Sequence, residues 1–108
     1  MKESGFQRKL IEEIKERFPG CVVMKNDPGY IQGIPDLTIL YNDRWAVLET
    51  KKEEGARHQP NQDRYVEKLN SMSFSAFIFP ENKEEILDGL EKALRPARGS
   101  STRLSEPE

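Results

Sequence analysis

The sequence predicts a small three-layer α/β domain with a central mixed sheet and the element order αβββαβα. Three segments place apolar residues at helical spacing, and four short runs have the composition of β-strands. The central hairpin, residues 35–51, carries apolar side chains on both of its faces. A sheet that is apolar on both faces is usually covered on both, commonly by helices.

The first half of the chain begins with a predicted helix over residues 4–18, and Pro19-Gly20 ends it. Its apolar residues recur at helical spacing: Phe6, Leu10, Ile11, Ile14 and Phe18. Residues 21–25 are predicted to form a short strand. Residues 26–34 contain two glycines and are predicted to form a loop.

The hairpin that follows brings two carboxylates together. Asn42-Asp43 suits a two-residue turn, since both residue types tolerate positive φ. The resulting register pairs Asp36 with Glu49, and directly opposed Cβ atoms lie about 4.5–5.5 Å apart. Lys51 shares the face of Glu49. Two carboxylates and a lysine suggest a divalent-metal site with a cationic helper, which is the chemistry of phosphodiester hydrolysis.

The hairpin also yields two structural expectations. Trp45 is expected in the core, on one apolar face together with Thr38, Leu40 and Val47. Opposed like charges are destabilising. Replacing Asp36 with alanine is therefore expected to stabilise the metal-free fold slightly. If the pair holds a catalytic metal, the same change should abolish cleavage of phosphodiester bonds.

The second half contains a charged loop over residues 52–59 and a predicted helix from Pro60 to about residue 71. Residues 75–79 are predicted to form the fourth strand. A third helix is predicted over residues 82–94, with Asn82 as its N-cap.

With 108 residues, the chain is expected to hold one domain over residues 1–94. Residues 95–108 lack periodicity, are rich in Ser, Pro, Arg and Glu, and are expected to form a disordered tail. The single cysteine, Cys21, excludes an intramolecular disulfide and a cysteine zinc cluster, and is expected to be a buried strand residue. No stretch suits a membrane span or a secretory signal, so a cytoplasmic location is expected.

The formal net charge of −2 is unusual for a domain that binds nucleic acid through phosphates alone. Bound metal would offset some of the acids, and basic residues cluster locally. This charge balance favours a homodimer that pools two basic surfaces.

Five short motifs follow one another along residues 3–79. They are Glu3-Ser4 with Gln7, Lys25, Gly33-Ile34-Pro35-Asp36-Leu37, Glu49-Thr50-Lys51, and Gly55 with Pro60-Asn61-Gln62. In these motifs the chain resembles the PD-(D/E)xK nuclease superfamily, and within it the virus-type replication–repair nuclease (VRR-NUC) group of small phage and bacterial domains. It departs from the group at Gln59, where Ser or Thr is more usual, and at residues 70–74, which lack a Gly-rich turn.

The resemblance implies a restriction-endonuclease-like core and a metal-dependent DNA endonuclease. Asp36, Glu49 and the backbone carbonyl of Thr50 would hold Mg²⁺, for which Mn²⁺ would substitute. Lys51 would orient or help deprotonate the attacking water. Glu3 would add a carboxylate, and Gln62 would touch the lysine or a phosphate.

Several of these residues have a structural interpretation as well. Glu3 could be only a favourable charge at a helix N-terminus, in which case Glu12 or Glu13 would supply the helix carboxylate of the site. Gln62 could be a solvated helix residue. The residues that could contact DNA are Lys25, Tyr30, Lys52, Arg57 and His58. Lys25 could instead be a strand-end lysine, Tyr30 a packed loop residue and His58 an exposed loop histidine.

The small stand-alone proteins of the group look like Holliday-junction resolvases. The resemblance to phage domains leaves open that this chain is phage-encoded and acts in the host cytoplasm. The resemblance therefore implies a structure-selective endonuclease that cuts branched DNA, such as a four-way junction, as a homodimer. Two alternatives remain open: a nicking or restriction-type nuclease of ordinary duplex, and a non-catalytic nucleic-acid-binding module.

Overall fold

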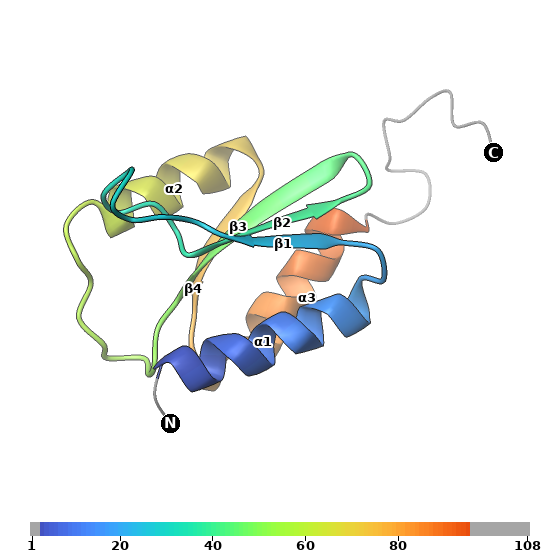
Figure 1. Ribbon diagram of the computed structural model, residues 1–108, viewed down its shortest axis with the longest axis horizontal. Helices are drawn as coiled ribbons and strands as arrows, with labels where there is room; N and C mark the ends of the chain where they lie inside the picture. The colour runs from blue at the N-terminus through green and yellow to red at the C-terminus, as the bar shows by residue number, and fades with distance from the viewer. Residues whose placement is uncertain (1–2, 96–108) are drawn as a thin grey trace.

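The structure, a computed structural model, describes residues 3–95, with side chains from residue 5 onward (Figure 1). The elements are α1 (Glu3–Arg17), β1 (Val22–Lys25), β2 (Leu37–Tyr41), β3 (Arg44–Thr50), α2 (Gln62–Met72), β4 (Phe74–Ile78), the 3-10 turn η1 (Pro80–Asn82) and α3 (Lys83–Leu94). The predicted mixed α/β class and element order are confirmed. The side chain of Glu3 and the expected tail over residues 96–108 lie outside the described part.

The four strands form one mixed sheet in the order β1-β2-β3-β4. β1, β2 and β3 are antiparallel neighbours, and β4 runs parallel to β3. The predicted hairpin register is confirmed, since Tyr41 pairs with Arg44 and Thr38 with Val47. β2 begins one residue after Asp36, and Asn42 takes the positive φ of the turn (56°).

Helices α1 and α3 pack on one face of the sheet and enclose the core (Figure 1). The core combines α1 side chains such as Leu10 and Ile14 with Ile39 and Leu48 of the sheet and Leu90 of α3, all of which are at most 1% exposed. The helical spacing of the apolar residues is explained by this arrangement, because the apolar side of each of the two helices packs against the same face of the sheet.

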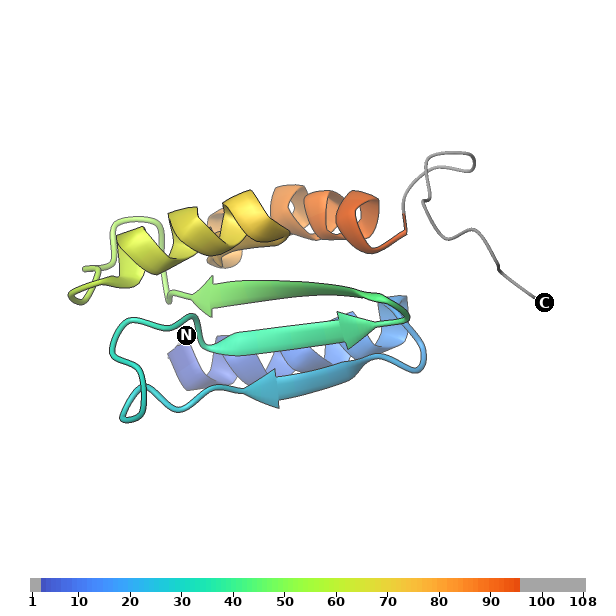
Figure 2. The same cartoon turned by 90° about the horizontal axis from the view of Figure 1, so that it is seen from above.

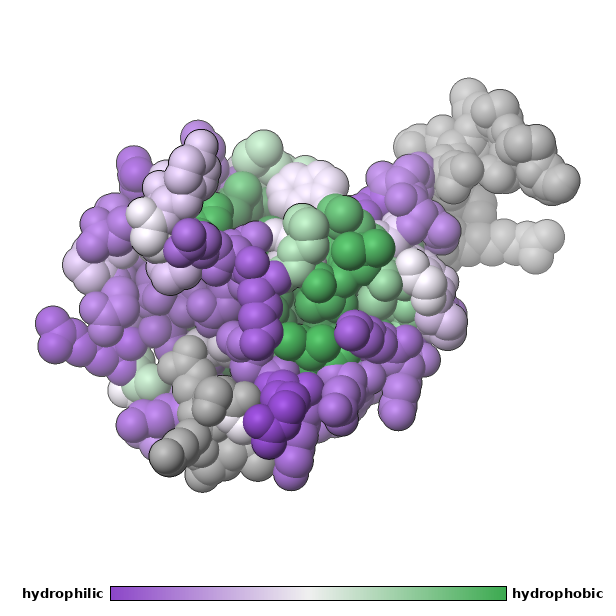
Figure 3. Space-filling view, viewed as in Figure 1, coloured by the Kyte–Doolittle hydropathy of each residue, from purple (hydrophilic) through white to green (hydrophobic). Residues whose placement is uncertain are grey.

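Among the described residues, α2 is the one helix on the opposite face; it lies toward the β4 side and leaves β1, β2 and much of β3 in view (Figure 2). We call the uncovered residues Val22, Met24, Leu40 and Trp45 the open face. They share one side of the sheet, because Val22 pairs with Leu40 and Leu40 with Trp45. Val22 is 51% exposed, Met24 43% and Leu40 38%. Figure 3 shows apolar residues gathered over β1 and the hairpin.

Two expectations about individual residues, Trp45 and Cys21, are corrected, and a third, Asn82 as N-cap, is confirmed in position only. Trp45 is half-buried on the open face and is not part of the core cluster. Cys21 precedes β1 and is half-buried, although burial still raises the pKa of its thiol against a smaller opposing effect of Lys15. Asn82 occupies the N-cap position of α3, but its side chain makes no capping bond to that helix. Instead it bonds the backbone of Phe77 and Phe79.

The loop over residues 26–34 is fixed against the start of α2 at Gly33. This glycine has φ +92°, and a Cβ at this position would lie 2.5 Å from Cβ of Asn61 and 2.9 Å from the carbonyl oxygen of Pro60. The close contact therefore fixes the position of the chain just before Pro35 and Asp36, the two residues that precede β2. Within the described residues, no helix is long and apolar enough to cross a membrane.

Candidate active site

An open pocket of about 440 Å³ lies at the end of the sheet where β2 begins and β3 ends. It is lined by Pro28, Asp36, Glu49, Lys51, Lys52, Ala56, Arg57, Gln59 and Gln62. The fold thus brings together six residues that the sequence singled out, from the β2 entry, the end of β3, the loop after it and the start of α2.

Asp36 is held by Thr50 across the hairpin. Its Oδ2 accepts hydrogen bonds from the Thr50 backbone N–H (3.0 Å) and from the Thr50 hydroxyl (2.6 Å). Gln7 of α1 in turn donates to that hydroxyl oxygen (3.0 Å). This geometry reverses the expectation that removing Asp36 would stabilise the metal-free fold, because alanine would leave two donors at Thr50 without this acceptor.

Lys51, Gln62 and Glu49 form a hydrogen-bonded chain on the other side of the pocket. The Lys51 ammonium donates to Gln62 Oε1 (2.7 Å), and Gln62 Nε2 donates to Glu49 Oε2 (2.8 Å). Lys51 Nζ also lies 3.8 Å from that carboxylate oxygen. Lys51 is 5% exposed and Glu49 2%, so the amide fixes two charged groups in a largely desolvated place.

The loop between β3 and α2 closes over this chain. The carbonyl oxygen of Arg57 accepts a hydrogen bond from Lys51 Nζ (3.0 Å), and the Gln59 N–H donates to Gln62 Oε1 (2.8 Å). With two donors at Oε1, the amide of Gln62 has its nitrogen directed at the carboxylate. Lys52 and Arg57 are exposed at the rim of the pocket.

His58 has partners within the fold, unlike a freely exposed loop histidine. Its ring stacks on Phe77 with centroids 4.1 Å apart and an interplanar angle of 18°. Its Nδ1 lies 2.7 Å from Asp63 Oδ1. His58 therefore anchors the loop to the sheet and to α2. It is exposed, and its role as a phosphate contact stays a prediction.

Lys25 and Tyr30 do not line the carboxylate pocket. Lys25 is exposed at the last position of β1, directly before Asn26, whose N–H donates to the carbonyl oxygen of Asp36 (2.7 Å). Tyr30 is 85% exposed and lies at a different hollow, lined in part by Trp45 and Val47 on the open-face side of the sheet.

One residue that the sequence did not single out helps to build the site. Asn26 Nδ2 donates to the Pro35 carbonyl oxygen and to the Thr38 hydroxyl, each at 2.8 Å. Together with the backbone bond to Asp36, these contacts fix the approach to β2. The available signal was its place immediately after a strand and before a turn sequence, where asparagine often bonds to backbone.

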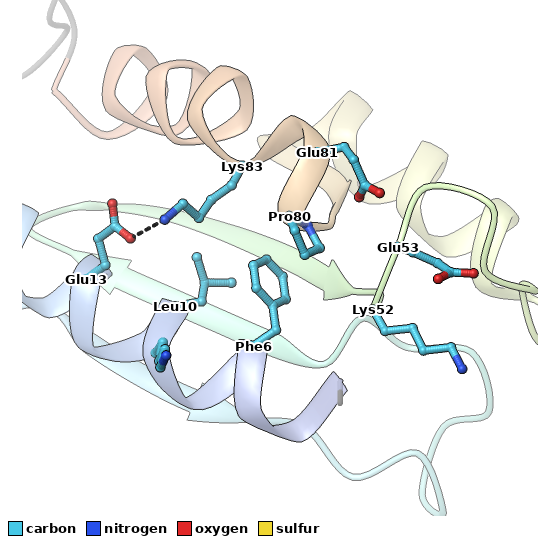
Figure 4. Close-up of a pocket in the computed structure, with 9 residues that line it drawn as sticks. Phe6, Leu10, Glu13, Lys52, Glu53, Pro80, Glu81 and Lys83 are labelled. Carbon is cyan, nitrogen blue, oxygen red and sulfur yellow. Dashed lines mark hydrogen bonds and ion pairs between the residues drawn. The ribbon is translucent and has the colours of Figure 1, made fainter. Parts of the chain in front are cut away.

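A second pocket, of about 460 Å³, lies between α1 and the start of α3 (Figure 4). Phe6, Leu10 and Pro80 form its apolar part, and the ammonium of Lys83 donates to Glu13 (2.9 Å). Lys52 lines both pockets. The carboxylate pair and the buried lysine belong to the other pocket, so the chemistry is assigned there.

The residues of the carboxylate pocket fit a hard divalent cation. Mg²⁺ in proteins is commonly held by one or two carboxylates, with waters and phosphate oxygens completing its octahedron. Asp36 and Glu49 supply such a pair. In the part of the chain with described side chains, no three His, Cys, Asp or Glu residues form a group that could hold an ion.

Comparisons with known proteins found no match, whether among protein-family models, curated proteins or solved structures.

Proposed function

We propose that this protein is a metal-dependent DNA endonuclease of the PD-(D/E)xK type. The observation that carries the proposal is the convergence of Asp36, Glu49, Lys51 and Gln62 in one pocket, with the lysine hydrogen-bonded to the amide and the amide to the carboxylate. These residues come from three separate segments of the chain. Their hydrogen bonds show that the four residues meet in one place, which the residue types in the sequence alone do not show.

The fold adds support of a more general kind. The four-stranded mixed sheet and the three helices agree with the element order αβββαβα and the central mixed sheet that the resemblance implies. A fold of this class hosts many functions, so the proposal depends on the site.

Each pocket residue has a role in phosphodiester hydrolysis. Asp36 and Glu49 would hold Mg²⁺, which when bound lowers the pKa of a water and neutralises charge on the phosphate. Lys51 would orient the attacking water and stabilise the charge that develops in the transition state. Gln62 positions the ammonium and the Glu49 carboxylate relative to each other. Lys52 and Arg57, exposed at the rim, would contact backbone phosphates.

For the substrate, we propose branched DNA such as a four-way junction, cut by a homodimer. Paired cuts on two symmetric strands require two active sites, which a two-fold dimer supplies. The formal net charge of −2 argues against strong non-specific binding to long duplex by one copy.

The test is cleavage of a labelled four-way junction beside matched linear duplex and single strand, in Mg²⁺, Mn²⁺ and EDTA. Wild-type protein is expected to make paired, metal-dependent cuts near the branch. Lys51→Ala and Asp36→Asn are expected to be inactive, because the first removes the ammonium that would orient the attacking water and the second removes a negative charge that would hold the metal. Lys68→Ala, which changes an exposed lysine of α2, is the matched control and should cut normally.

The other outcomes separate the alternatives. Equal cutting of linear duplex would leave the active site in place but identify a nicking or restriction-type nuclease. Retained cutting in Asp36→Asn would refute the assigned site. If no substrate is cut in either metal, while binding persists, the protein is a non-catalytic nucleic-acid-binding module.

A further inference from the structure

The first strand, β1, forms one outer edge of the sheet (Figure 2). The N–H of Asn26 bonds to Asp36 on β2, so in the alternating antiparallel ladder Met24 and Val22 also direct their backbone groups to β2. The backbone groups of Val23 and Lys25 therefore point away from the sheet. Within residues 3–95 no strand pairs with them.

Natural edge strands are commonly kept short or are protected by charged side chains, proline or bulges. β1 is only four residues long and has its one charge, Lys25, at its end, so its central residues carry neither a charge nor a proline. Here the strand reads Val22-Val23-Met24 before its single charge at Lys25, and Val22 and Met24 are 51% and 43% exposed. An apolar strand with unpaired backbone groups is a template for another strand.

From these features we infer that β1 pairs antiparallel with β1 of a second copy of the chain, about a two-fold axis at Val23, and joins two sheets into one. In this register the backbone groups of Val23 bond to those of Val23 in the second copy. Val22 then lies opposite Met24 of the other copy on the open face, and the two Val23 side chains oppose each other on the opposite face. The edge is self-complementary, as a two-fold interface requires.

Charge and composition favour a second copy over other occupants. The register places Lys25 opposite Cys21 of the second copy, so no like charges meet, whereas centring the pair on Lys25 would oppose two lysines. Within the same chain, residues 96–108 are a poor occupant by composition, because Leu104 is their only large apolar residue.

The pairing would place the two carboxylate pockets in a two-fold relation. Five strand spacings separate one β3 from the other, roughly 24 Å across the sheet. Only this consequence, paired cutting, rests on the proposed function. The interface itself is measured without any substrate, so failure of the dimer and failure of the nuclease are distinguishable.

The first test is the mass of the full chain in solution, by sedimentation or light scattering over a concentration series. Wild type is expected to be dimeric. Val23→Pro removes an N–H that points away from β2, so it should abolish the dimer while the far-UV spectrum stays native. Val23→Ala shortens the same side chain but keeps the N–H, and should stay dimeric.

A second pair of variants tests the register on exposed side chains. Val22→Lys with Met24→Lys opposes like charges across the interface and should give a monomer. Val22→Lys with Met24→Glu places opposite charges at the same two sites and should restore the dimer, with an affinity that falls as salt is raised. Both variants lose the same apolar surface.

The inference is overturned by a monomeric wild type, by a dimer that survives Val23→Pro, or by equal behaviour of the two charge variants. If the dimer is not found, the rate of amide hydrogen exchange at Val23 and Lys25 shows whether another segment covers the β1 edge. Protection that does not change with protein concentration would mean that the chain's own residues cover the edge.

Discussion

At the scale of single residues, Gln62 connects the two charged groups of the site. Replacing it with methionine keeps the length of the side chain but removes one acceptor of Lys51 and one donor to Glu49. We expect cleavage to fall about 10- to 100-fold, as for other residues that orient metal ligands. The free energy of unfolding should fall by about 1–3 kcal/mol, because two buried charged groups each lose a partner.

The measurement for Gln62→Met is the single-turnover cleavage rate together with urea unfolding. Glu67→Gln, an exposed change on the same helix, should leave both unchanged. A variant that cuts at the wild-type rate would show that the amide is structural only.

At the scale of elements, the loop before β2 depends on its contact with the start of α2. Gly33 and Gly20 both have φ +92°, but a Cβ at Gly33 would meet Asn61 and Pro60 within 3 Å, and one at Gly20 would meet nothing within 4 Å. Gly20→Ala therefore measures the conformational cost alone, about 1–2 kcal/mol. Gly33→Ala should cost about 1–3 kcal/mol more, because the loop must shift.

Denaturant unfolding of both glycine variants checks this expectation. Equal losses would mean that the contact between the loop and α2 relaxes without cost. Since the same contact precedes Asp36, Gly33→Ala should also slow cleavage, whereas Gly20→Ala should not.

The ion pair between Glu13 of α1 and Lys83 of α3 should contribute to the free energy of unfolding in a way that depends on pH. The hydrogen bond to Glu13 raises the pKa of Lys83 above the ordinary lysine value of 10.5, and burial opposes this effect. A raised pKa in the folded state stabilises the fold below pH 10.5, and the contribution is lost as pH rises through the folded-state pKa. Both side chains are about 30% exposed, so the pair should contribute only about 0.2–1 kcal/mol.

The comparison of wild type with Lys83→Met at pH 8 and again well above pH 10.5 tests this link. The difference in unfolding free energy should be present at pH 8 and should disappear at the higher pH. A difference that does not change with pH would assign the effect to the aliphatic part of the lysine.

Element types and the hairpin register could be predicted from sequence because they depend on local signals, such as apolar spacing and the Asn42-Asp43 turn. The open face could not be predicted from such local signals. Whether a helix covers a sheet face depends on where α2 lies, and the alternation of apolar residues does not encode this position. The sequence pattern therefore predicts Trp45 in the core, whereas it lies on the open face. The partner of Asp36 was also missed, because its bond to Thr50 depends on side-chain rotation at the strand end.

At the scale of the whole molecule, a divalent cation that binds only the folded protein must stabilise it. At ten times its dissociation constant, one bound ion adds about 1.4 kcal/mol, or roughly 6–11 °C in Tm for a domain of this size. Mg²⁺ or Mn²⁺ should therefore raise the Tm of wild type above that in EDTA at matched ionic strength. This readout needs no DNA and no catalysis.

Two variants determine where such an ion binds. Asp36→Asn keeps an oxygen that can accept from Thr50 but loses the charge, so its Tm should no longer respond to the metal. Lys52→Ala changes only an exposed rim residue and should respond as wild type does. An equal response of Asp36→Asn and wild type would place the ion elsewhere. If wild type does not respond at all, the pair Asp36 and Glu49 holds no metal in the free protein, and binding would then require the phosphate of the substrate as a further ligand.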